Sequence, residues 1–130
     1  MKKEELGNLA VELKAMEGTN CCQAVALALA DETKMQKDDL RMIGAGFGSG
    51  MGTMDATCSA LVGAGIIASL KTEGKSSKKF TSQILTRFRE LSGAVACKDL
   101  KGRDTGVVLC PCDKCVYNAV AAYCETFGIE

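Results

Sequence analysis

The chain has 130 residues, of which 47% are hydrophobic and 25% charged, and its 16 basic side chains balance 16 acidic ones. This composition predicts a single cysteine-rich globular domain over residues 1–130, excludes a disordered chain, and argues against nucleic acid as a partner, because no basic surplus exists. No apolar run reaches the roughly 18 residues that a membrane span needs, and the start MKKEEL lacks a signal-peptide core, which predicts a cytoplasmic protein.

The first part of the chain is predicted to form three helices. Leucines recur at helical spacing from Leu6 to Leu13, which indicates an amphipathic helix. The segment 21–32 is apolar on nearly every face, so we expect a buried, central helix there. A shorter helix is predicted over 37–43.

A glycine-rich stretch follows over residues 44–52, in which glycine alternates with other residues. It matches no nucleotide-binding motif, and a strand with so many glycines would be weak, so we predict a loop with close backbone packing. Backbone N–H groups in such a loop can bind an anion or a cluster sulfur. We therefore expect the backbone of Gly50, Met51 and Gly52 to contribute to cofactor binding.

The second part of the chain adds further helices and no strand pattern. The segment 55–70 is apolar almost all round, and its Gly63 and Gly65 predict close approach to another helix. An amphipathic helix is predicted over 77–91 and a last helix over 113–127. The prediction is an all-α fold, a compact bundle of five or six helices with two central apolar helices and the glycine-rich loop.

The chain has eight cysteines and no histidine, which predicts that its chemistry depends on sulfur. Without histidine, the chain has neither Cys–His catalysis nor histidine-ligated zinc or haem. A short helical turn is also predicted over 97–100, so four cysteines lie at or near predicted helix starts, where the partial positive charge of a helix terminus stabilises a thiolate. These four candidate redox thiols or metal ligands are Cys21, Cys58, Cys97 and Cys115.

The other four cysteines differ in their settings. On the predicted helices, Cys22 points about 100° away from Cys21, and Cys124 points about 180° away from Cys115. Both orientations favour a packing role. Cys110 and Cys112 belong to the run CPCDKC, which combines C-x-C with the C-x-x-C spacing of dithiol redox sites and metal chelates. Cys112, and with it Cys110, is therefore a candidate to replace one of the four as a ligand or to act as a resolving thiol.

The sequence CSALVG, which begins at Cys58, resembles the motif of the C-GCAxxG-C-C family of redox-active proteins, which carry four characteristic cysteines. Asn20-Cys21, the glycine run 48–52, Cys97 and Cys115 match in order, so the resemblance covers most of the chain. It implies a redox function and the same four cysteines. Ser59 departs from the family pattern, which has glycine there. Similar cysteine arrangements in split-Soret cytochromes are associated with an iron–sulfur cluster.

Three interpretations of the site follow from these patterns. The cysteines hold an iron–sulfur cluster that carries single electrons, or, without a cofactor, they cycle between dithiol and disulfide and carry two. The alternative is a binding module that zinc stabilises through four cysteine ligands and that has no redox activity. The redox interpretations require an unidentified redox partner protein. The sequence leaves open whether the chain is an enzyme and whether it forms a homodimer.

Overall fold

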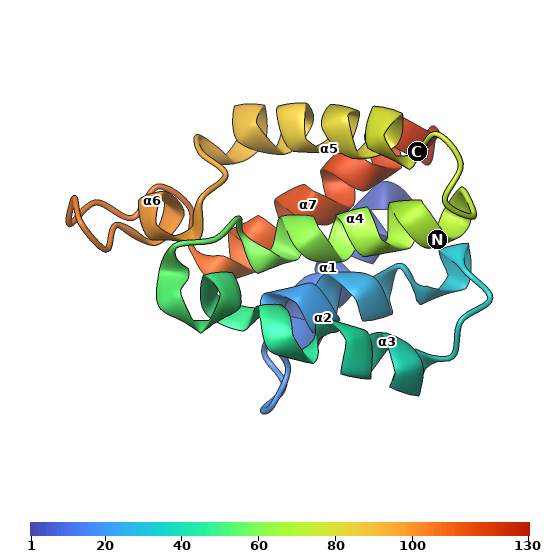
Figure 1. The fold of residues 1–130 in the computed structure, drawn as a ribbon, viewed down its shortest axis with the longest axis horizontal. Coiled ribbons are helices and arrows are strands. Elements are labelled where there is room, and N and C mark those ends of the chain that lie inside the picture. The colour runs from blue at the N-terminus through green and yellow to red at the C-terminus, as the bar shows by residue number, and fades with distance from the viewer.

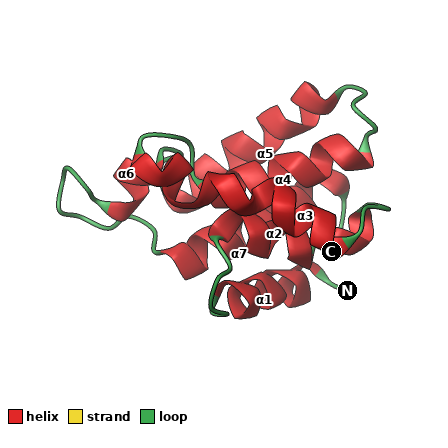
Figure 2. Ribbon diagram, turned by 60° about the horizontal axis from the view of Figure 1, so that its bottom comes forward, coloured by secondary structure: helices red, strands yellow, loops and turns green.

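A computed structural model describes residues 1–130 and confirms the all-α prediction. Turns and loops join the helices, and a ten-residue segment without helix, 102–111, connects α6 to α7 (Figure 2). The only β-type pairing is an isolated bridge between Thr57 and Ala96. None of the helices has both the length and the apolar character needed to cross a membrane. The α-helices are α1 (Lys3–Lys14), α2 (Cys21–Ala28), α3 (Lys37–Gly44), α4 (Ser59–Lys71), α5 (Ser77–Ser92), α6 (Cys97–Lys101) and α7 (Cys112–Phe127).

The core is built on three helices where the sequence predicted two. Every residue of α2 is buried, as predicted, and α4 packs between α2 and α5 (Figure 1). Helix α7 is the third core element, because it contacts α1, α2, α4 and α5. It buries an almost continuous run from Ala119 to Cys124. Helix α4 is less enclosed than its sequence suggested, since Val62 and Ile66 on one face are only half-buried.

Gly63 allows α2 and α4 to approach closely. A Cβ atom at Gly63 would lie 2.6 Å from the backbone oxygen of Cys22, which is too close for any side chain. A Cβ atom at Gly65 would meet only Thr81 at 3.7 Å, an ordinary contact distance. The prediction of close helix approach is therefore confirmed at Gly63 and wrong for Gly65.

The glycine-rich segment forms helical turns where an irregular loop was predicted. After α3, the chain makes a 3-10 turn over Ala45–Phe47 and a π-helical turn over Gly50–Met54. The backbone is left-handed at Gly50 and Gly52, and also at Ser49, Met51 and Met54. Residues 55–58, which were predicted to start the next helix, instead contain the isolated bridge at Thr57 and the cap residue Cys58, so α4 begins only at Ser59.

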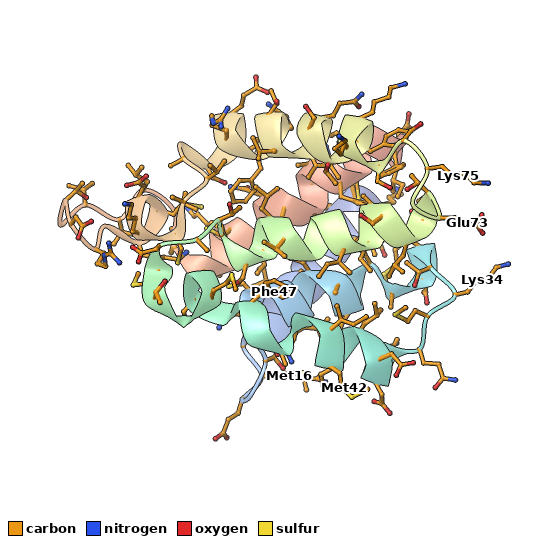
Figure 3. The ribbon with its side chains drawn as sticks, in the orientation of Figure 1. Met16, Lys34, Met42, Phe47, Glu73 and Lys75 are labelled. Carbon is orange, nitrogen blue, oxygen red and sulfur yellow. The ribbon has the colours of Figure 1, made fainter.

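Two apolar surface features contain no cysteine. A groove of about 650 Å³ between α4 and α5 is lined by side chains such as Val62, Ile66 and Leu85. Met16 and Met42 are 57% and 69% exposed and lie on the same side of the molecule in the view of Figure 3. The groove is also lined by hydroxyl side chains and one lysine, Lys78, but by no carboxylate or thiol.

Candidate functional site

A small cavity of about 90 Å³ collects four cysteines from four separate helices. Cys21, Cys97 and Cys112 are the first residues of α2, α6 and α7, and Cys58 is the residue immediately before α4. The amino-terminal ends of these helices therefore converge on one point, where their N–H groups favour negative charge. The other residues that line the cavity are Lys14, Asn20, Ser49 and Ser59.

Asn20 fixes the start of α2 and so the position of Cys21. Its side chain accepts a hydrogen bond from the backbone N–H of Gln23 at 2.8 Å, and the Gln23 side chain accepts from the backbone N–H of Asn20 at 2.9 Å. The Asn20 amide also donates to the backbone oxygen of Gly44 at 3.1 Å. This reciprocal cap stabilises the helix start and ties it to the end of α3.

The isolated β-bridge holds Cys58 beside Cys97. The backbone N–H of Cys58 donates to the oxygen of Val95 at 2.7 Å, and that of Cys97 donates to the oxygen of Ala56 at 2.9 Å. Gly50 packs against the same pair, since a Cβ atom there would lie 2.8 Å from the Cβ of Cys97. The φ angle of Gly50 is +57°, which glycine adopts most easily. Both this backbone conformation and the close contact with Cys97 therefore require glycine here.

The three glycine-loop residues predicted to bind a cofactor have different surroundings. Gly50 contacts Cys97, as described. Met51 is 60% exposed, and a Cβ atom at Gly52 would meet nothing within 4 Å. The structure therefore places Gly50 at the cysteine cavity and leaves a cofactor-binding role for the loop as a prediction.

Cys58 is the helix cap of α4, and its environment favours the thiolate. The side-chain interaction with Cys115 is the largest cause that lowers its pKa, and the backbone N–H groups of Ala60 and Leu61 add to the effect. Burial opposes these interactions, yet the net result is a pKa of about 7. The interaction with Cys58, together with burial, raises the pKa of Cys115, whose thiol donates to the backbone oxygen of Cys110 at 3.4 Å. Of these two neighbouring cysteines, Cys58 is therefore the one whose surroundings favour the thiolate.

Cys112 and Cys21 form a second pair of the same kind. A hydrogen bond from the Cys21 thiol is the main cause that lowers the pKa of Cys112, to about 5, and Lys101 also lowers it. The same hydrogen bond, together with burial, raises the pKa of Cys21. Cys112 is the one cysteine of the eight that is only half-buried, so this pair is the one that solvent reaches.

Lys101 is a half-buried cation that contacts both pairs. Its Nζ lies 3.2 Å from the Sγ of Cys115 and donates to the backbone oxygen of Cys110 at 3.0 Å, and its positive charge lowers the pKa of Cys112. Burial alone would lower the pKa of Lys101, but its interactions with Cys115, Cys112 and Cys58 raise it, so the ammonium form persists. Sequence patterns did not indicate Lys101, although it lies one helical turn after Cys97.

Cys112 lies at the cavity, where the sequence predicted Cys115. Cys21, Cys58 and Cys97 line the cavity, but the fourth lining cysteine is Cys112, while Cys115 is fully buried behind Cys58. The physical reason is that α7 begins at Cys112, one residue before the predicted start. The cysteine cluster therefore has five members, which are the four predicted residues Cys21, Cys58, Cys97 and Cys115 together with Cys112.

The remaining cysteines face other parts of the protein. The Sγ of Cys110 accepts a long hydrogen bond from the Asn118 amide at 3.7 Å. Cys22 and Cys124 have no exposed surface, and burial raises their pKa values to about 12 and about 11. Burial in the core agrees with the packing role predicted for these two residues.

All eight cysteines are free thiols, and no group of three or more cysteine, aspartate or glutamate side chains is arranged to hold a metal ion. The structure presents four free cysteines around one cavity, with Cys115 buried close to them.

A family model described as "Putative redox-active protein (C_GCAxxG_C_C)" matches residues 19–126 of the chain. The matched region extends from the start of α2 to the end of α7 and includes every cysteine. No curated protein and no solved structure matches the chain.

Proposed function

Because the chain belongs to this family of redox-active proteins, we propose that it is a thiol–disulfide carrier that transfers two electrons through pairs of neighbouring cysteines. The observation that supports the proposal is the Cys21–Cys112 pair, in which an accessible sulfur with a lowered pKa lies beside a protonated thiol. A dithiol site needs such a pair, since one thiolate attacks and its neighbour resolves the mixed disulfide.

The proposed reaction begins at Cys112. Its thiolate attacks one sulfur of a partner's disulfide and forms a mixed disulfide, and the other partner sulfur leaves as a thiolate. Cys21 then loses its proton and attacks the Cys112 sulfur, which releases the second partner thiolate. The partner gains two electrons, and its two sulfurs take up the Cys21 proton and one proton from water. The partner is a disulfide-bearing protein or small molecule, and a cytoplasmic location remains a prediction.

Oxidised glutathione provides a direct test. The anaerobically purified, reduced protein should lose two thiols per chain at limiting reagent, and peptide mass spectrometry should identify a Cys21–Cys112 linkage. Cys112→Ser should slow the first thiol loss at least about tenfold, since the accessible thiolate is removed. The matched control is Cys124→Ala, which changes a buried cysteine on the same helix and should react like the wild type. Wild-type rates in Cys112→Ser would contradict the proposal.

An iron–sulfur cluster is the second candidate, and one observation favours it. Cys21, Cys58, Cys97 and Cys112 line a single cavity, and four cysteine thiolates are the donor set that such clusters use. A cluster bound there would supply one-electron transfer. As placed, these side chains do not form a metal-binding group, and for that reason we rank the thiol mechanism first.

A zinc-stabilised binding module is the non-redox alternative. Zinc would serve folding, but the three-helix core already buries an extensive apolar surface, so the need for it is weak. Metal analysis of anaerobically purified protein separates the three candidates. Iron with labile sulfide and visible absorption would support the cluster, and zinc alone would support the module. A metal-free protein whose thiol count falls on oxidation would support the thiol carrier.

A further inference from the structure

Building on the proposed function, we propose that the chain carries two cysteine pairs that act in series. The outer pair, Cys21 and Cys112, exchanges with the partner, and the inner pair, Cys58 and Cys115, receives the disulfide from it. The protein would then store four electrons where a simple dithiol stores two.

Exposure sets the order of the pairs. Cys112 is half-buried and Cys21 is 7% exposed, whereas Cys58 is 2% exposed and Cys115 has no exposed surface. A disulfide reagent from solution therefore meets Cys112 first. It has no direct access to Cys115, and it reaches Cys58 only through the cavity that Cys112 lines.

The two pairs adjoin at that cavity. Cys58 of the inner pair and both members of the outer pair line the same space of about 90 Å³. Cys115 has no exposed surface, its thiol donates to the backbone oxygen of Cys110 at 3.4 Å, and its interaction with Cys58 raises its pKa. A disulfide formed in the outer pair therefore has the nucleophile Cys58 at the same cavity. Cys115 is the more deeply buried thiol that resolves the next disulfide.

Lys101 contacts one sulfur of each pair, which suits a transfer between them. Its Nζ lies 3.2 Å from the Sγ of Cys115, and its charge lowers the pKa of Cys112. A cation at this place stabilises a thiolate on either residue, so it assists the departure of Cys112 as well as the attack by Cys115. No other ammonium or guanidinium group forms a hydrogen bond to a cysteine sulfur.

The transfer balances without an added oxidant. The Cys58 thiolate attacks the Cys112 sulfur of the outer disulfide, and Cys21 leaves as a thiolate that takes up a proton. Cys115 loses its proton and attacks the Cys58 sulfur, and Cys112 leaves as the thiolate beside Lys101. The outer pair returns to its reduced form and the inner pair holds the disulfide. A second partner disulfide can then oxidise the outer pair again.

Time-resolved thiol mapping with oxidised glutathione tests the series. With one equivalent per chain, acid quenching and differential alkylation should reveal the Cys21–Cys112 disulfide first and its later replacement by Cys58–Cys115. With excess reagent, four thiols should be lost. Cys58→Ser should trap the outer disulfide and limit the loss to two thiols. Serine is a favoured helix cap, so this variant keeps the start of α4, and far-ultraviolet circular dichroism checks its folding. Cys115→Ser is the second trap, and Cys124→Ala the matched control.

The outcomes separate this inference from the proposed function. A stable Cys21–Cys112 disulfide in the wild type, with no Cys58–Cys115 disulfide at any time, would overturn the series and leave the thiol carrier intact. Formation of Cys58–Cys115 at the wild-type rate in Cys112→Ser would also overturn it, because the inner pair would not need the outer one. If neither disulfide forms in the wild type, the proposed function itself fails.

Discussion

The ammonium group of Lys101 lies 3.2 Å from the Sγ of Cys115, on the inner side of the cysteine cluster. Five neighbouring thiols would resist multiple ionisation, because like charges in a poorly solvated site repel. A single cation in contact with two of the sulfurs offsets that repulsion. It also links the end of α6 to the start of α7, since the same group donates to the backbone oxygen of Cys110.

Replacing Lys101 with methionine should make Cys112 less reactive. The variant loses a charge-assisted hydrogen bond and a nearby positive charge, so the pKa of Cys112 should rise by roughly one to two units. Alkylation of Cys112 by iodoacetamide at pH 5.5 should slow several-fold, as measured by peptide mass spectrometry. Lys98→Met is the matched control, because Lys98 lies on the same short helix and contacts no cysteine sulfur. Equal rates in the two variants would mean that Lys101 does not tune the site.

The rate of alkylation of Cys112 should change with pH near 5, well below the range of an ordinary thiol. Hydrogen bonding from Cys21 lowers the pKa of Cys112 from the ordinary 9.0 to about 5, so its thiolate is present above about pH 5 and is lost as the pH falls through that value. The pH profile of alkylation should therefore have its midpoint near 5. Cys124 is buried and has a pKa of about 11, so it should stay unmodified throughout. A midpoint near 9 would show that Cys112 behaves as an ordinary thiol.

Alanine at Gly50 should disturb the site, whereas alanine at Gly52 should not. Both glycines have positive φ, +57° and +79°, so each substitution carries a backbone cost of about 1–2 kcal/mol. Only Gly50→Ala adds a clash, since its Cβ would lie 2.8 Å from the Cβ of Cys97. Urea unfolding should give a larger loss of stability for Gly50→Ala, and its Cys97 should become more accessible to alkylation. Equal effects of the two substitutions would exclude a packing role for Gly50.

Two glycines on α4 should respond to alanine with opposite signs. Gly63→Ala should destabilise the protein by about 1–3 kcal/mol, because the new Cβ meets the Cys22 backbone oxygen at 2.6 Å and the helices must separate. Gly65→Ala should stabilise it by up to about 1 kcal/mol, since alanine has the higher helix propensity and the nearest atom is 3.7 Å away. Thermal or urea unfolding measures both. A stable Gly63→Ala variant would contradict the close approach of α2 and α4.

Local patterns were sufficient to predict the helices and most of the cysteine positions. Amphipathic periodicity located helices such as α1 and α5, a continuous apolar run located α2, and α2 begins at Cys21 as predicted. The positions of Cys21, Cys58 and Cys97 at helix starts follow from the same local signals. The three residues line one cavity, and their role as redox thiols or ligands stays a prediction.

Tertiary structure alone decided how the sulfurs pair and which cation accompanies them. Cys112 and Cys115 are three positions apart, and α7 begins at Cys112, one residue before the predicted start, so Cys112 lies at the helix end that lines the cavity. Lys101 reaches the sulfurs because the chain folds back on α6, where the backbone N–H groups of Leu109 and Cys110 both donate to the oxygen of Leu100. Contacts of this kind depend on how distant segments fold against one another, so local sequence patterns do not indicate them. The sequence therefore determined which residue types stand at helix ends, and the packing of four helices against one another determined which of those ends meet.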